Sequence, residues 1–159
     1  MVTEMTAEEA RNHLRYSSWA SRRLLDAAMQ LPDDQLHREM NVSHKTIFDT
    51  LTHIHMADRV WMERITGSKI EQSEPIEVAW PQIWQRWEDF LDSAQDSDLA
   101  GVIAYQDLRG NSHESALWQI VLHVVNHATL HRGQVMAMFR QIGLQPPATD
   151  LIFYFREKK

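Results

Sequence analysis

The chain of 159 residues contains no cysteine. This absence excludes disulfide bonds, a cysteine nucleophile and thiolate metal ligands, so a zinc-like site must be built from imidazole and carboxylate groups. The chain also lacks any run of about 18 apolar residues, which argues against a membrane-spanning helix. Its first residues, MVTEMTAEEARNHL, are too polar for a signal peptide. We therefore expect a cytoplasmic protein that does not enter the membrane.

Positive charge is in short supply, with 16 basic against 22 acidic residues and a formal net charge of -6. A phosphate backbone would be repelled on average, so nucleic-acid binding is disfavoured. The length fits one domain on the usual prior of about 100 to 200 residues, and 43% apolar residues are enough for a continuous core. We expect a single domain over residues 1–159.

Hydrophobic periodicity predicts an all-α fold with four main helices. Apolar residues recur at helical spacing from Ala7 to Gln30 and again over the run that ends at Gly67, with Ser43 as the expected N-cap of the second helix. A third helix is expected from about Pro81 to Asp96. The fourth is expected from about Ser115 to Ile142, where glycine and a proline pair end it. These four segments predict a four-helix bundle.

Two stretches outside these helices have weaker patterns. Between Gly101 and Ser115, the β-prone VIAY and the turn-like DLRGN predict a short hairpin or an irregular connection before the last long helix. The C-terminal ATDLIFYFREKK alternates aromatic and aliphatic residues, which is compatible with either a short helix or a strand packed on the bundle.

Five of the nine histidines lie in two short segments, THIH at 52–55 and HVVNHATLH at 123–131. At about 100° per residue, His127 and His131 fall on one stripe of the last helix, together with Leu117, Ile120, Val124, Gln134 and Met138. Two histidines four residues apart present both imidazoles to a single ion. The alternative is a pair of hydrogen-bonded core histidines, but each unpaired buried nitrogen costs about 1–3 kcal/mol. The pattern therefore favours a metal.

Other histidine motifs can be excluded or placed on the same helix. His123 lies one turn earlier and about 60° off the stripe, so we expect it at the rim of the site. The HATLH segment lacks the glutamate of an HExxH protease, and no Glu-x-x-His pair of the ferritin-like di-iron type occurs in the chain.

The second helix offers His53 or His55 as a third ligand. The helical spacing of apolar residues slightly favours His55, which shares a face with Leu51, Asp58 and Met62. His53 instead shares its face with Thr46, Ala57 and Val60, whose smaller side chains would leave room for a metal cavity. The pattern alone leaves both open.

The segments SHKTIFDTLTHIHMADRVWMERITG and LWQIVLHVVNHATLHRGQV resemble the DinB/YfiT-like family of metalloenzymes. The resemblance covers nearly the whole chain, and NHATLHRGQ at 126–134 is its most specific part. It implies a four-helix bundle that is often dimeric. It also implies that the ligand of the second helix is followed five residues later by an acid and eight later by tryptophan, which matches His53, Asp58 and Trp61. The implied metal ligands are therefore His53, His127 and His131.

The resemblance further implies a divalent metal ion, zinc or nickel, and a metal-dependent transferase or isomerase that uses a low-molecular-weight thiol such as bacillithiol, mycothiol or glutathione. Our leading hypothesis is thiol S-transfer to an electrophilic substrate. The alternative is a non-catalytic metal-binding protein of stress response or interaction. No catalytic residue is identified. Asp58 is expected to orient a ligating imidazole through a hydrogen bond, and His55 to pack or hydrogen-bond nearby.

Two further residues and the oligomeric state complete the expectations. Gly133 inside a helix costs about 1 kcal/mol relative to alanine, which predicts a close approach of another backbone or a ligand. Arg132 is expected to bind a carboxylate or a loop, either as a salt bridge between helices or as a substrate contact. The six tryptophans and the apolar residues on more than one face of the second helix predict a homodimer.

Overall fold

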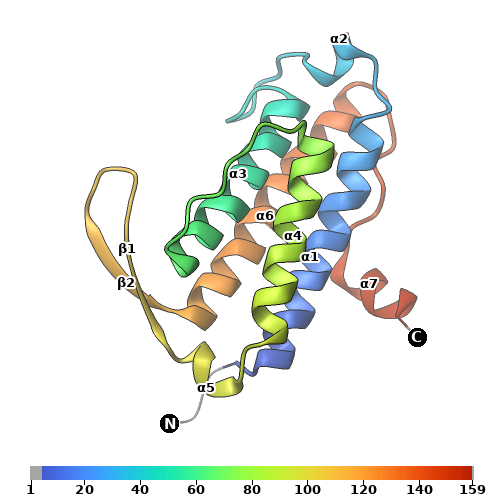
Figure 1. The fold of residues 1–159 in the computed structure, drawn as a ribbon. Helices are drawn as coiled ribbons and strands as arrows, with labels where there is room; N and C mark the ends of the chain where they lie inside the picture. The colour runs from blue at the N-terminus through green and yellow to red at the C-terminus, as the bar shows by residue number, and fades with distance from the viewer. Residues whose placement is uncertain (1–4, 159) are drawn as a thin grey trace.

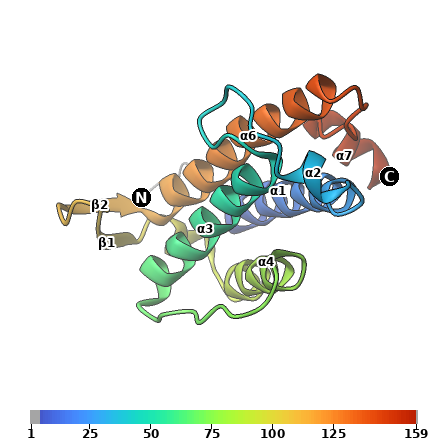
Figure 2. The ribbon, with the colours of Figure 1, turned by 90° about the horizontal axis from the view of Figure 1, so that it is seen from above.

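Four long helices form the main body of the computed structural model, which describes residues 5–158 (Figure 1). They are α1 (Ala7–Ala28), α3 (Ile47–Thr66), α4 (Ile76–Asp92) and α6 (Leu117–Gln141). Helices α1 and α3 each pack against both α4 and α6, and Figure 2 shows the four seen from above. This arrangement places α3 and α6, which carry the clustered histidines, next to each other.

Three short helices and one hairpin complete the described part of the chain. The helices are α2 (Asp33–Leu36), α5 (Asp96–Leu99) and α7 (Leu151–Glu157). The hairpin pairs β1 (Val102–Gln106) with β2 (Ser112–Ala116) in antiparallel register, and its base is closed by a hydrogen bond from Leu117 N to Gly101 O at 2.9 Å. The connection before the last long helix is therefore a hairpin, and the tail is a helix. The chain is mostly helical, and the small sheet departs from a strictly all-α fold.

Side-chain caps set the start of two long helices. Thr6 and Glu9 form a capping box on α1, with Thr6 Oγ1 accepting from Glu9 N and Glu9 Oε2 accepting from Thr6 N. Helix α3 is capped by Thr46, whose Oγ1 accepts from Asp49 N at 2.9 Å. The prediction that Ser43 caps this helix was wrong, since Ser43 lies three residues too early and contacts a side chain of α6 instead.

The predicted bounds of α4 were also wrong. The helix begins at Ile76 rather than Pro81, and it ends at Asp92 rather than Asp96. Pro81 therefore lies inside the helix, where it lacks the N–H that would bond to the carbonyl of residue 77. Trp80 is fully buried and Ile76 nearly so. We attribute the early start to the burial of these two side chains, each worth about 1.5–3 kcal/mol, which offsets the lost hydrogen bond.

The core lies between the four long helices. The largest buried apolar side chains come from all of them, and each of the following is at most 1% exposed: Leu24, Leu25, Ile47, Leu51, Ile54, Trp80, Ile83, Ile120 and Met138. Helix α6 is buried on two faces because it packs against α1 on one side and α3 on the other. None of the helices in residues 5–158 is long and apolar enough to cross a membrane.

Candidate metal centre

The three histidines implied as ligands meet at the seam between α3 and α6. The Nε2 atoms of His53 and His127 lie 3.0 Å apart. The ring of His131 lies 4.5 Å, between centroids, from each of the other two rings. The packing of α3 against α6 thus brings together residues that are more than seventy positions apart in the chain.

A fourth histidine, His44, lies in the same cluster and was not predicted. Its ring stacks on His53 with 3.8 Å between centroids and lies 5.2 Å from the ring of His131. His44, His53 and His131 each offer one ring nitrogen, and these nitrogens all lie within 4.8 Å of one another. His44 belongs to the loop before α3, where helical periodicity gives no direction. It also lies outside the two histidine-rich segments at 52–55 and 123–131, so no signal in the sequence pointed to it.

The other candidate histidines lie outside this cluster. His55 is 5% exposed, and its Nε2 lies 2.6 Å from Gln72 Oε1 while its ring packs near Trp80. The structure thus brings His53, and not His55, to His127 and His131. His123 is exposed and its ring centre lies 5.8 Å from that of His127, which agrees with the expected place at the rim.

The environment keeps these imidazoles neutral. Burial, together with the charges of neighbouring histidines, lowers the pKa of His53 to about 4 and that of His127 to about 4. Burial also lowers the pKa of His44. Divalent metal ions bind the neutral form of imidazole, so His44, His53 and His127 are in their ligating state at neutral pH.

Hydrogen bonds around the cluster leave nitrogens free for an ion. His131 Nδ1 donates to Gln134 Oε1 at 2.8 Å, which orients the ring and leaves the lone pair of Nε2 unused. His127 Nδ1 is buried without a hydrogen-bond partner in the described residues. Zinc–nitrogen bonds of about 2.0–2.1 Å place neighbouring ligand nitrogens roughly 3.3 Å apart in a tetrahedron, close to the observed separation of His53 and His127. The donor set therefore fits a divalent ion.

A mostly apolar groove of about 210 Å³ begins at His53. It runs along the outer face of α3, past Met56 and Trp61, to Leu108 in the turn of the hairpin. Arg64 also lines it, with its guanidinium 4.5 Å from the centre of the Trp61 ring and 5.2 Å from that of Tyr105. A ligand in this groove would contact apolar surface, one cation and the edge of the histidine cluster.

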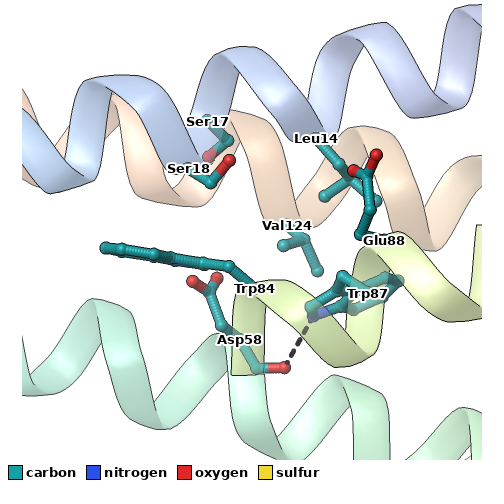
Figure 3. A pocket seen from close by; sticks show the side chains of 8 residues that line it. All are labelled: Leu14, Ser17, Ser18, Asp58, Trp84, Trp87, Glu88 and Val124. Carbon is teal, nitrogen blue, oxygen red and sulfur yellow. Dashed lines mark hydrogen bonds between the residues drawn. The ribbon is translucent and has the colours of Figure 1, made fainter. Parts of the chain in front are cut away.

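Asp58 lies away from the cluster, in a small cavity between α1, α3 and α4 (Figure 3). Its Oδ2 accepts from Trp80 Nε1 at 2.7 Å, and its buried Oδ1 has no hydrogen-bond partner in the described residues. The cavity is about 20 Å³, enough for one water molecule, and is also lined by Ser17 and Trp84. The expectation that Asp58 orients a ligating imidazole is therefore wrong, because its hydrogen bond goes to a tryptophan.

The pKa of Asp58 is raised to about 7 by burial. The hydrogen bond from Trp80 and the positive charge of Arg132 oppose this rise without cancelling it. Asp58 is thus a buried carboxyl group that changes charge near neutral pH.

Arg132 joins α6 to α1 through neutral partners instead of a carboxylate. It is 1% exposed. Its Nη1 donates to Ser17 O, Ser17 Oγ and Ser21 Oγ, and its Nη2 donates to Thr129 Oγ1. This supports a role between helices and not a substrate contact. The expectation that another backbone approaches Gly133 was wrong, since a Cβ there would meet no atom of the described residues within 4 Å.

The fold and the cluster together define a class: small, mostly helical proteins with a histidine cluster between two long helices. Comparison with known proteins places the chain within it. The model of the DinB family matches residues 1–159, and the chain belongs to this family. Protein DinB of Bacillus subtilis (strain 168) is 26% identical over 155 residues, covering 87% of this chain and 89% of that protein.

A solved structure gives the same assignment. The crystal structure of a DinB-like protein from Bacillus cereus ATCC 10987 is similar with a TM-score of 0.63 and 25% sequence identity, and the match covers 90% of this chain and 97% of that one. The family resemblance seen in the sequence is confirmed.

Proposed function

We propose that this DinB-family protein binds one divalent metal ion, zinc or nickel, through His53, His127 and His131, inside a four-helix bundle of α1, α3, α4 and α6. The observation that carries the proposal is the meeting of neutral imidazoles from α3 and α6, with Nε2 atoms of His53 and His127 3.0 Å apart. Three protein ligands leave open positions at such an ion, as catalytic sites require.

The activity we propose is thiol S-transfer or isomerisation with a low-molecular-weight thiol. A divalent ion at this site would lower the pKa of a thiol that it binds. In the transfer, the sulfur forms a bond to an electrophilic carbon, the leaving group departs with the bonding electron pair, and the thiol proton passes to solvent. Gln134 would hold the His131 ring in place, and the groove beside His53 would hold the apolar part of the substrate.

The test is elemental analysis of the purified protein followed by a thiol screen. We expect about one divalent ion per chain, and metal-dependent conjugation of an electrophilic reporter with at least one of bacillithiol, mycothiol and glutathione. The His131→Ala variant should lose both. Protein that carries no metal, and that keeps its melting temperature in chelator, would reject the site.

A second candidate is metal binding without catalysis, in stress response or interaction. The observation that favours it is His44, a fourth imidazole at the cluster, because four protein ligands are typical of closed structural sites. Holo protein that conjugates the reporter with none of the thiols would select this candidate.

We also propose a cytoplasmic homodimer. Apolar side chains on α7 support the dimer, since Ile152 is 53% and Phe155 45% exposed. Light scattering should return twice the chain mass, and a monomer mass would reject it.

A further inference from the structure

We propose that His44 is a fourth ligand of the same metal ion, carried by the loop between α2 and α3 as a cap over the side left open by His53, His127 and His131. The inference rests on the proposed metal-binding function and deepens it. It changes the nature of the centre, because tetrahedral zinc with four imidazoles has no open position: it must release one imidazole or expand to five ligands before an external thiol or water can bind.

The His44 ring already lies close to two of the other imidazoles. It lies flat against His53, at an angle of 21° and 3.8 Å between centroids, and its centroid is 5.2 Å from that of His131. The ligand nitrogens of His44, His53 and His131 span at most 4.8 Å. Tetrahedral zinc needs about 3.3 Å between nitrogens, so ring movements on the order of 1 Å bring His44 into the coordination sphere.

A hydrogen-bond network links the His44 loop to the cluster. Gln134 Oε1 accepts from His131 Nδ1 at 2.8 Å and from Ser43 Oγ at 3.5 Å. One amide on α6 therefore orients a metal ligand and contacts the residue next to His44. The second contact, at 3.5 Å, is the longer and weaker of the two.

The backbone of the loop turns tightly at this point. Lys45 has a φ of 63°, a left-handed conformation that is uncommon for a residue other than glycine. Hydrogen bonds from Lys45 N to Val42 O and from Met40 N to Lys45 O close the turn. This turn directs the chain so that His44 lies against α3 just before the helix begins. Among the four histidines, His44 is the one on a loop, so we infer that it is the ligand a substrate displaces.

The experiment compares the wild type with His44→Ala and His44→Gln, using His37→Ala as the matched control. His37 belongs to the same connecting segment, and its ring packs on Phe48, away from the cluster. Each protein is loaded with cobalt(II) for visible spectroscopy and titrated with zinc against a chromophoric chelator. X-ray absorption of the zinc-loaded wild type counts its imidazole ligands without any substitution.

The expected result is four imidazoles on zinc in the wild type and an unchanged spectrum in His37→Ala. Both His44 variants should retain one ion per chain, with zinc affinity reduced about 10- to 100-fold. This is the loss that is typical when a residue hydrogen-bonded to a metal ligand is substituted. Their cobalt spectra should weaken as solvent replaces the imidazole. Three imidazoles in the wild type, or His44 variants that match it in affinity and spectrum, would overturn the inference and leave the three-histidine site standing. A wild type without metal would reject the proposed function itself.

Discussion

His131 and Arg132 are adjacent on α6, yet they serve two very different polar regions. Arg132 points to α1 and donates hydrogen bonds to Ser17, Ser21 and Thr129. His131 points to α3, where other imidazoles are its main neighbours. A buried cation that donates several hydrogen bonds to a neighbouring helix holds a fold together, whereas partly buried imidazoles that face one another can share a ligand.

Arg132 and the histidine cluster should therefore affect different properties of the protein when they are substituted. Changes at Arg132 should lower the free energy of unfolding and spare the metal. Changes in the histidine cluster should remove the metal and spare the metal-free fold.

The largest effect is expected for Arg132→Met. The substitution leaves Ser17 O and the hydroxyls of Ser17, Ser21 and Thr129 without their donor, so we expect a loss of about 3–5 kcal/mol in the free energy of unfolding. Urea unfolding of the metal-free protein measures it. Arg140→Met, at an exposed position near the end of the same helix, is the control and should change stability by less than about 0.5 kcal/mol. Equal effects of the two substitutions would contradict the prediction.

The next effect is the removal of metal. An ion present at about 100 times its dissociation constant stabilises the fold by about 2.7 kcal/mol. For a domain of this size chelation should therefore lower the melting temperature by about 5–11 °C. Scanning calorimetry with and without chelator measures the shift. His131→Ala should show none, while Arg140→Met should keep all of it; a shift that survives in His131→Ala would place the ion elsewhere.

Asp58 predicts a pH dependence of stability. Its pKa is about 7 in the folded protein against an ordinary value of 3.8, so the fold favours the protonated form. The contribution of Asp58 to the free energy of unfolding is complete below about pH 3.8 and is lost as the pH rises to about 7. Between these values the free energy of unfolding falls by at most about 1.4 kcal/mol per pH unit.

The difference between the wild type and Asp58→Asn, both metal-free, isolates this group. The histidines with lowered pKa values act in the opposite direction below about pH 6.5, but they are common to both proteins. Between pH 5 and 7 the wild type should lose stability relative to Asp58→Asn. If the free energies of unfolding of the two proteins changed in parallel across that pH range, Asp58 would have to stay in one charge state.

The smallest effect is expected for His127→Ala in the metal-free protein. The substitution creates a small cavity but also removes a buried Nδ1 that has no partner in the described residues. These terms oppose each other, so the free energy of unfolding should change by no more than about 1 kcal/mol. A loss as large as that of Arg132→Met would mean that the cluster is part of the structural core.

Some parts of the candidate site could be predicted from the sequence alone. Hydrophobic periodicity predicted the direction of His127 and His131, because apolar residues continue the same stripe of α6 before and after them. On α3 it correctly found the core face, since Leu51, His55, Asp58 and Met62 are all at most 5% exposed. The same pattern favoured His55, which lies outside the histidine cluster. The cluster lies at the edge of the core, where His53 is only partly buried, and the family resemblance was needed to select it.

Other features lay outside what periodicity can detect. His44 is on a loop, and its direction depends on the turn at Lys45 and on the packing of α3 against α6. The early start of α4 depends on the burial of Trp80, which outweighs the local preference of Pro81. Both are tertiary effects on local conformation.

The hairpin offers a route for evolutionary change in this protein. Its two strands leave and rejoin the bundle at Gly101 and Leu117, whose backbones are hydrogen-bonded to each other, so its length can vary without moving α6. Its turn contributes Leu108, 95% exposed, to the groove beside His53. A longer or shorter hairpin would therefore reshape this groove while the histidine cluster and the helices that hold it stay the same.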